Sequence, residues 1–232
     1  MFVIPCKFSK DSPYVIDLVE SIRKFHPNDK ITVVDSDSED KSYFSILEKL
    51  NVKILDIANR NWMVGAYWKG FLDSPDEDFY YFLHDSTIVK GDVHYLEKDP
   101  LTVLASFIRT GHVSFNAWND RINTETKYRV SNSGCGVFGP MFLCQNSVMK
   151  NLYNNNAHVI LPSNKAETGF MEGAFGAFFE CEGFDVMKCA LYGDILAQES
   201  PGGKSYPYPF NTSWQHPIEK FYASHRDGKR LL

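Results

Sequence analysis

The chain has 232 residues, of which 44% are hydrophobic and 15% aromatic, and it carries a formal net charge of −5. This length and composition predict a globular protein with a sizeable core, in one domain that could comprise two unequal lobes. The acidic balance and the absence of a long run of Lys and Arg argue against a nucleic-acid partner. No stretch approaches the ~18 apolar residues that span a bilayer, and the first residues lack a signal-peptide pattern, so no transmembrane segment is expected.

The cysteines are five in number and contain no C-x-x-C pair. An odd count without paired spacing predicts reduced thiols and a cytoplasmic location rather than a disulfide framework, and zinc is not expected.

The first ninety residues alternate short apolar segments with helical patterns. Four strands are predicted, at residues 2–6, 31–34, 52–55 and 79–83. Three helices are predicted between them, at residues 13–25, 43–50 and 62–73, because apolar residues recur there at helical spacing. This alternation predicts βαβ units with right-handed crossovers and a mainly parallel sheet.

Polar residues follow these strands where the chain leaves the sheet. Asp35 and Asp37 come directly after the second strand, and the fourth strand ends on His84-Asp85-Ser86. Because carboxyl ends of parallel strands meet at one edge, where open α/β sheets bind ligands, we expect these acids to share a crevice. The alternative is that His84-Asp85-Ser86 only begins a surface turn.

The second part of the chain has a less regular pattern. Residues 101–108 and 112–118 read as two strands or as a strand and a helix, and the polar residues 119–128 are predicted to form an exposed, mobile loop. The glycines of residues 131–140 could allow close approach of a ligand or could form an ordinary bend. A helix is predicted at residues 145–153.

A further helix with one apolar face follows Glu167, ends at Gly183 and is predicted to lead into a strand at residues 184–187. Glu172 lies in its first turn, where the helix dipole favours a carboxylate whatever its function, although it could also be a base at the mouth of the crevice. The tail from residue 201 is too rich in Pro and Gly for regular structure, and it could be a lid or a packed terminal arm.

Together, these segments resemble a known family. The segment F-V-I-P at residues 2–5, the acids after the second strand, His84-Asp85-Ser86-Thr87 and the position of Glu172 before Phe184 are similar to a GT-A glycosyltransferase of the nucleotide-diphospho-sugar transferase superfamily. The resemblance covers about residues 1–190. It implies a GT-A (Rossmann-like) mixed, mainly parallel α/β sheet flanked by helices, with a nucleotide-binding half (1–90), an acceptor and catalytic half (91–200) and a tail (201–232).

The resemblance also implies roles for the nucleotide-binding residues. Asp35 or Asp37 would contact the nucleoside, and Pro5, Lys7 and His84 complete the predicted set. Asp85 occupies the first position of the D-x-D motif that holds a divalent cation, Mn²⁺ or Mg²⁺, against the diphosphate. At the second position this chain has the hydroxyl of Thr87.

The catalytic base implied by the resemblance is Glu172, with Glu167 as the second candidate. A metal-binding histidine from the tail would be His216, or else His225.

The implied reaction moves a sugar from a nucleotide-diphosphate donor to a glycan or other acceptor hydroxyl. Such a reaction needs a base for the acceptor proton and positive charge on the leaving diphosphate, from a metal or from lysines such as Lys7 and Lys10. Trp62, Tyr67 and Trp118 are candidate surfaces for stacking a sugar, although aromatic residues at helical spacing are more often core.

Two other classes remain open. A sugar-nucleotide nucleotidyltransferase would need a glycine-rich loop after the first strand, which this chain lacks. A non-catalytic nucleotide-sugar-binding or assembly protein is indicated by the incomplete D-x-D motif.

Overall fold

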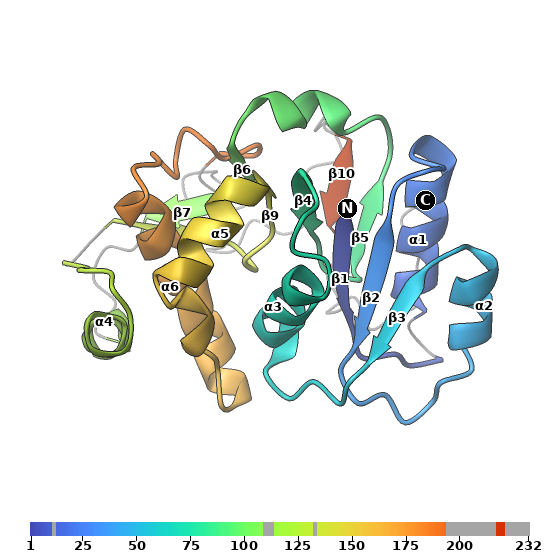
Figure 1. The fold of residues 1–232 in the computed structure, drawn as a ribbon, viewed down its shortest axis with the longest axis horizontal. Coiled ribbons are helices and arrows are strands. Elements are labelled where there is room, and N and C mark those ends of the chain that lie inside the picture. Colours follow the sequence, from blue (N-terminus) through green and yellow to red (C-terminus); the bar gives the residue numbers. More distant parts are fainter. Residues whose placement is uncertain (11–12, 109–113, 132–133, 194–216, 221–232) are drawn as a thin grey trace, which may run out of the picture.

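The computed structural model describes residues 1–10, 13–108, 114–131, 134–193 and 217–220 (Figure 1). Its centre is a six-stranded sheet with the strand order β3-β2-β1-β4-β9-β6. The strands are β3 (Lys53–Asp56), β2 (Ile31–Asp35), β1 (Phe2–Cys6), β4 (Phe79–Phe82), β9 (Phe142–Gln145) and β6 (Leu101–Val103). The first four strands in chain order are parallel, whereas β9 is antiparallel to both of its neighbours. The predicted α/β class, with a mixed and mainly parallel sheet flanked by helices, is therefore confirmed.

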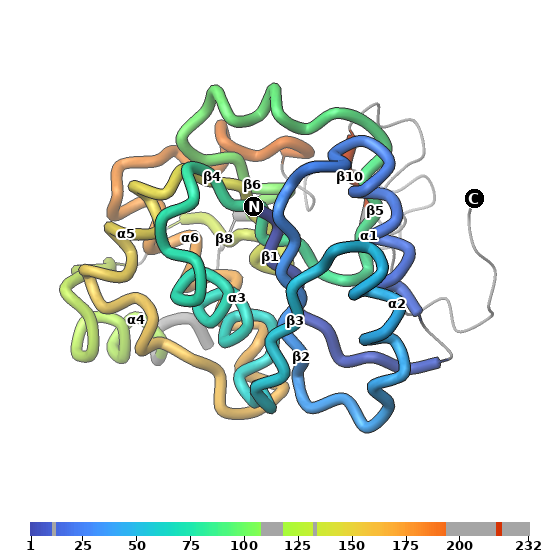
Figure 2. The backbone as a smooth tube through the Cα atoms, turned by 45° about the vertical axis from the view of Figure 1, so that its right-hand side comes forward, coloured from blue at the N-terminus to red at the C-terminus, as the bar shows by residue number. Residues whose placement is uncertain are grey.

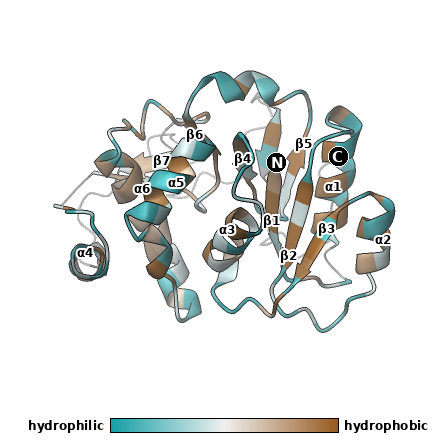
Figure 3. Cartoon of the chain, viewed as in Figure 1, coloured by the Kyte–Doolittle hydropathy of each residue, from teal (hydrophilic) through white to brown (hydrophobic). Residues whose placement is uncertain are grey.

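Helices cover both faces of this sheet, because successive strand side chains point to opposite sides. Val3, Val34 and Phe82 face one core together with α3 (Trp62–Asp73), α5 (Asn146–Asn154) and α6 (Thr168–Cys181). Ile4, Val33 and related side chains face a second core with α1 (Tyr14–Phe25) and the turn that leads into α2 (Phe44–Lys49). Figure 3 shows apolar colour along β1 and β2, as expected for strands buried on both faces.

The sequence prediction for the first ninety residues is confirmed, with the four strands and three helices within two residues of their predicted bounds. Strand β4 lies at the centre of the sheet, between β1 and β9. Helix α5 is confirmed as well.

The segment predicted as a mobile loop at residues 119–128 is largely helical, and this prediction is wrong. Helix α4 spans Ser114–Glu125. Its buried residues Trp118 and Ile122 belong to the core that α6 completes. The Nε of Arg121 donates to Glu125 at 2.9 Å on the polar side of the helix. The periodicity is hard to see in the sequence because the apolar stripe is so narrow.

The strand predicted at residues 184–187 is also wrong, because residues 184 and 185 have no regular structure and residues 186 and 187 lie in a turn. Helix α6 ends in a Schellman motif: Gly183 has a φ of 89°, and the amide of Phe184 donates to the carbonyl of Phe179 at 3.0 Å. The carboxylate of Asp185 then accepts from the amide of Lys188 at 3.2 Å, which closes a turn.

Two small strand pairs complete the fold. β7 (Ser106–Ile108) pairs with β8 (Cys135–Val137), and β5 (Thr87–Val89) pairs with β10 (Ile218–Lys220), beside which it lies in Figure 2. The prediction that the tail has no regular structure is wrong for β10, which forms a packed arm. The rest of the tail lies outside the described residues.

Three short 3-10 helices connect these elements: η1 (His94–Lys98), η2 (Ala157–Val159) and η3 (Lys165–Glu167). Within the described ranges, no helix has the length and apolar character that crossing a membrane requires. All five cysteines are free thiols.

Candidate functional site

The order in which the chain adds strands to the sheet reverses at β1. From β1 it proceeds to β2 and β3 on one side, and it then returns to place β4 on the other side. Such a switch point leaves a crevice beyond the carboxyl ends of the strands. A cleft of about 380 Å³ opens there. Its lining residues come from the end of β1, from the segments after β1, β2, β3 and β4, and from the start of α3: Pro5, Cys6, Lys7, Ser36, Asp37, Asn59, Arg60, Trp62, Met63, His84 and Asp85.

This cleft brings together most of the residues predicted for nucleotide binding. Pro5, Lys7, Asp37, His84 and Asp85 all line it. They come from the end of β1 and from the loops after β1, β2 and β4, which the parallel strands place at one edge of the sheet.

Asp35 lies beneath the cleft rather than in its lining. Its side chain is fully buried, with Oδ1 accepting from the hydroxyl of Tyr43 at 2.6 Å and Oδ2 accepting from the amide of Ser38 at 2.9 Å. The Oγ of Ser38 in turn accepts from the amide of Phe8 at 2.8 Å. The buried carboxylate thus fixes the loop that carries Asp37 and ties it to the loop after β1.

The cleft loops hold non-glycine residues in the left-handed region. Asp37, Ala58 and Trp62 have φ values of 62°, 46° and 48°. Asn59 maintains this arrangement, because its Nδ2 donates to Ser36 Oγ at 3.0 Å and to the carbonyl of Trp62 at 2.6 Å. Each such residue costs about 1–3 kcal/mol, and backbone strain of this kind concentrates at ligand sites.

The loop after β4 places Asp85 but not Thr87 in the cleft. Thr87 is 1% exposed and its hydroxyl donates to the carbonyl of His84 at 2.6 Å, so it is used within the loop. Burial, and next the negative charge of Asp85, raise the pKa of the Cys6 thiol and of the Tyr67 hydroxyl. Cys6 and Asp85 both line the cleft.

Glu172 does not line the cleft, and it lies beyond the first turn of α6 in which the sequence places it. Its contact with the lining is indirect, through Gly139. The amide of Gly139 donates to Glu172 Oε1 at 2.8 Å. Gly139 has a φ of 55°, and a Cβ placed on it would lie 3.2 Å from Cε1 of His84. Gly139 therefore contacts both the predicted base, Glu172, and the loop after β4.

Two further predicted residues lie elsewhere. Glu167 is not part of the cleft lining; its Oε2 accepts from the amide and hydroxyl of Ser163, at 2.6 and 2.8 Å, and these bonds lower the pKa of Glu167. Lys10 pairs with Asp40 at 3.1 Å.

The tail histidines predicted as metal ligands, His216 and His225, lie outside the described residues.

Of the three predicted stacking residues, Trp62 alone lines the cleft. Tyr67 and Trp118 are 1% and 7% exposed. The ring of Trp118 is covered by the guanidinium of Arg121 at 4.9 Å and by the ring of Phe170 at 5.7 Å.

Five lining residues were not predicted from the sequence: Cys6, Ser36, Asn59, Arg60 and Met63. For Asn59 and Arg60 a signal was present, because Asn59-Arg60-Asn61-Trp62 follows the third strand just as the two acids follow the second. Asn61 also reaches the second part of the chain, since its Nδ2 donates to the carbonyl of Pro162 at 3.0 Å.

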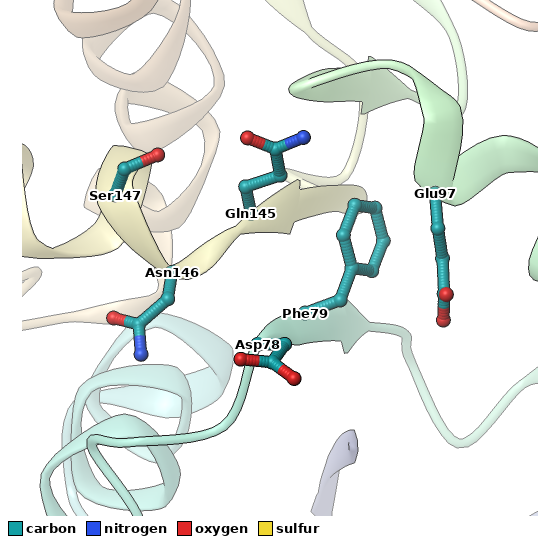
Figure 4. Close-up of a pocket in the computed structure, with 6 residues that line it drawn as sticks. All are labelled: Asp78, Phe79, Glu97, Gln145, Asn146 and Ser147. Carbon is teal, nitrogen blue, oxygen red and sulfur yellow. The ribbon is translucent and has the colours of Figure 1, made fainter.

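A second cavity, of about 300 Å³, lies at the opposite edge of the sheet, where β4 begins and β9 ends. Figure 4 shows Glu97 of η1 on one side of Phe79 and Gln145, Asn146 and Ser147 on the other. Asp78 completes the lining, and none of these six residues is basic. This lining is a poor match for a diphosphate.

The described residues also contain a group that could hold a metal ion: His26, Asp29 and His94. It lies near the amino end of β1, because the ring of Phe2 is 5.8 Å from that of His26. The group is thus at the edge of the sheet opposite Asp85.

No family model and no curated protein matches the sequence. Among solved structures, residues 1–349 of TarS from S. aureus match with 16% identity and a TM-score of 0.46, over 76% of this chain and 55% of that chain. GalNAc-T7, solved with UDP, GalNAc and Mn²⁺, matches with 15% identity and a TM-score of 0.46, over 65% of this chain and 36% of that chain.

The galactosyltransferase LgtC, solved with donor and acceptor sugar analogues, matches with 11% identity and a TM-score of 0.42, over 76% of this chain and 71% of that chain. This chain spans between 29% and 55% of the matched TarS chains.

Proposed function

We propose that the protein is a glycosyltransferase that binds a nucleotide-diphosphate sugar in the cleft and transfers the sugar to an acceptor hydroxyl. The observation that carries this proposal is the composition of the cleft at the switch point. It combines two cations, Lys7 and Arg60, with the acids Asp37 and Asp85 and one aromatic surface, Trp62.

Each part of a nucleotide sugar has a chemical counterpart among these residues. Lys7 and Arg60 match the charge of a diphosphate, with Arg able to bind phosphate oxygens in a bidentate manner. The carboxylate of Asp37 can accept hydrogen bonds from a ribose, and the ring of Trp62 can stack on a base or a sugar. The volume of about 380 Å³ lies within the range of small-molecule sites.

A divalent cation would be held by Asp85. Oxygen ligands suit Mg²⁺ and Mn²⁺, and one carboxylate with the phosphates of the substrate can suffice. Thr87 does not contribute, because its hydroxyl donates to a carbonyl within its own loop. When bound, such a cation supplies positive charge to the leaving diphosphate.

Glu172 is the proposed base that takes the proton of the acceptor hydroxyl. Its Oε1 accepts from the amide of Gly139, and Gly139 lies against His84 of the cleft lining. General base catalysis of this kind contributes about 10²- to 10⁴-fold to the rate.

The test is release of nucleoside diphosphate from a panel of nucleotide sugars, UDP-sugars included, with candidate acceptors and with or without Mn²⁺. We expect turnover that falls about 10²-fold or more in Glu172→Gln and in Asp85→Asn. The matched control is Asp56→Asn, at the same edge of the sheet, because Asp56 pairs with Lys41 and does not line the cleft. Full turnover in both cleft variants would overturn the assignment of these residues.

A non-catalytic binding protein is the second candidate, and the position of the Thr87 hydroxyl favours it. It predicts nucleotide binding without release of diphosphate from any donor. It also predicts that Glu172→Gln binds nucleotide as the wild type does.

A further inference from the structure

The group formed by His26, Asp29 and His94 joins two segments that are far apart in the sequence. His26 and Asp29 follow helix α1, whereas His94 begins η1, which comes after β5. One ligand atom from each residue lies within 4.8 Å of the other two. Asp29 Oδ2 is 2.8 Å from His94 Nε2 and 3.6 Å from His26 Nδ1.

His26 provides a second, independent indication of a ligand. Its side chain is 1% exposed, and its Nδ1 is buried without a hydrogen-bond partner. This nitrogen points toward the acids, with Asp92 Oδ1 at 4.0 Å as well as Asp29 at 3.6 Å. A buried polar atom without a hydrogen-bond partner costs about 1–3 kcal/mol of stability, so an ion or another group that binds this nitrogen is expected.

The spacing of these atoms suits a small divalent ion. Zinc binds His nitrogen and carboxylate oxygen at about 2.0–2.2 Å, so tetrahedral ligands lie roughly 3.3–3.6 Å from one another. The separation of 3.6 Å between Asp29 Oδ2 and His26 Nδ1 fits this value, and that of 2.8 Å between Asp29 Oδ2 and His94 Nε2 would widen when the ion binds. Asp92 could supply the fourth ligand, because its Oδ1 lies 4.0 Å from His26 Nδ1 and its side chain is 69% exposed.

We propose that His26, Asp29 and His94 form a zinc site at the amino-terminal edge of the sheet. Two imidazoles with a carboxylate favour zinc or another transition metal over Mg²⁺ or Ca²⁺. The cysteine spacing gave no reason to expect zinc, and this site uses none of the cysteines. It is distinct in position and in ligand chemistry from the cation that Asp85 would hold.

Zinc binding has one structural consequence near Val93. The amide of Val93 contacts Nε2 of His26 at 3.2 Å, so in the metal-free protein that nitrogen accepts and Nδ1 carries the ring hydrogen. A metal on Nδ1 moves this hydrogen to Nε2, and the contact with Val93 must open. The backbone around Val93 is therefore expected to shift when zinc binds.

The role of this site is to hold the turn after α1 to the segment after β5. His94 is 46% exposed, so an ion can reach the site from solvent. Because the ligands come together only in the folded chain, zinc is expected to stabilise the fold.

The test is calorimetric titration of the full chain with ZnCl₂ after treatment with EDTA and desalting. We expect one equivalent to bind at micromolar or tighter Kd, and Tm to rise by about 5–10 °C at a hundredfold excess over Kd. His94→Gln, at a half-exposed position that should not prevent folding, is expected to weaken binding at least tenfold. Asp29→Asn provides a second variant with the same expectation.

The matched control is His158→Gln, because His158 stacks on Tyr153 at 4.2 Å and belongs to a different part of the fold. Zinc affinity should not change in this variant. Co²⁺ in place of zinc should give the visible absorption of a nitrogen- and oxygen-ligated site in the wild type and not in His94→Gln. No stoichiometric binding, or equal binding by wild type and His94→Gln, would show that the group is only an ion pair between Asp29 and His94.

Discussion

The amide of Gly139 donates a hydrogen bond of 2.8 Å to Glu172, while a Cβ on the same residue would lie 3.2 Å from the ring of His84. One backbone position therefore sets the distance between the proposed base and the loop that carries Asp85. A side chain at residue 139 would disturb both contacts.

Gly139→Ala is expected to lower turnover strongly and the free energy of unfolding only modestly. The positive φ costs an alanine about 1–2 kcal/mol, and the added methyl displaces His84. Gly169→Ala is the control, because that glycine lies in α6 close to Glu172 and has no atom within 4 Å of its Cβ position. There the exchange should be neutral or stabilise by up to about 1 kcal/mol. Equal turnover in the two variants would refute the role of Gly139.

Asp35→Asn is expected to lower the free energy of unfolding by about 1–3 kcal/mol, measured by urea denaturation. The amide cannot accept from both the Tyr43 hydroxyl and the Ser38 amide, which the carboxylate does in the buried loop. Asp37→Asn, on the rim of the cleft, should stay within about 0.5 kcal/mol of the wild type. A stable Asp35→Asn variant would show that the buried network does not hold the loop.

Tyr67→Phe is expected to leave the free energy of unfolding unchanged or to raise it by up to about 1 kcal/mol. The Tyr67 hydroxyl is buried without a hydrogen-bond partner, so removing it loses no hydrogen bond. Tyr43→Phe is the matched comparison and should destabilise by about 1–3 kcal/mol, because that hydroxyl donates to Asp35 at 2.6 Å. The reverse order in thermal or urea unfolding would contradict this description of the core.

Trp62→Ala is expected to change nucleotide affinity, whereas Trp118→Ala is expected to change stability. Trp62 lines the cleft, and loss of stacking should lower nucleotide affinity by about 1–3 kcal/mol with little change in stability. Trp118 is buried against Arg121 and Phe170, so its removal should lower stability by about 3–5 kcal/mol. Binding by calorimetry and unfolding by urea, measured on both variants, separate these effects. Normal affinity in Trp62→Ala would remove that residue from the site.

The alternation of strands and helices in the first ninety residues could be predicted because it rests on local periodicity. The location of the cleft followed from it, since parallel strands bring Lys7, Asp37 and Asp85 to one edge. The separation of Asp35 from Asp37 could not be predicted in this way, because residues two apart on a strand point to the same side. It depends on the end of β2 at Asp35 and on the turn in which Asp37 has a φ of 62°.

Other features depend on tertiary contacts that leave little trace in the sequence. Among the residues of helix α4 whose burial is described, the apolar stripe in the core consists of Trp118 and Ile122, in a polar segment. The approach of Gly139 to His84, and the meeting of His26 with His94, join residues more than fifty positions apart. No local pattern predicts such pairs.

The most direct test of the central claim is calorimetric titration of the protein with a panel of nucleoside diphosphates, with and without Mn²⁺ or Mg²⁺. The account predicts that one nucleotide binds the wild type and Asp56→Asn equally, and that Asp37→Asn and Asp85→Asn bind it at least tenfold more weakly. Absence of binding by the wild type across the panel, or equal affinity in all four proteins, would contradict the assignment of the cleft as a nucleotide-sugar site.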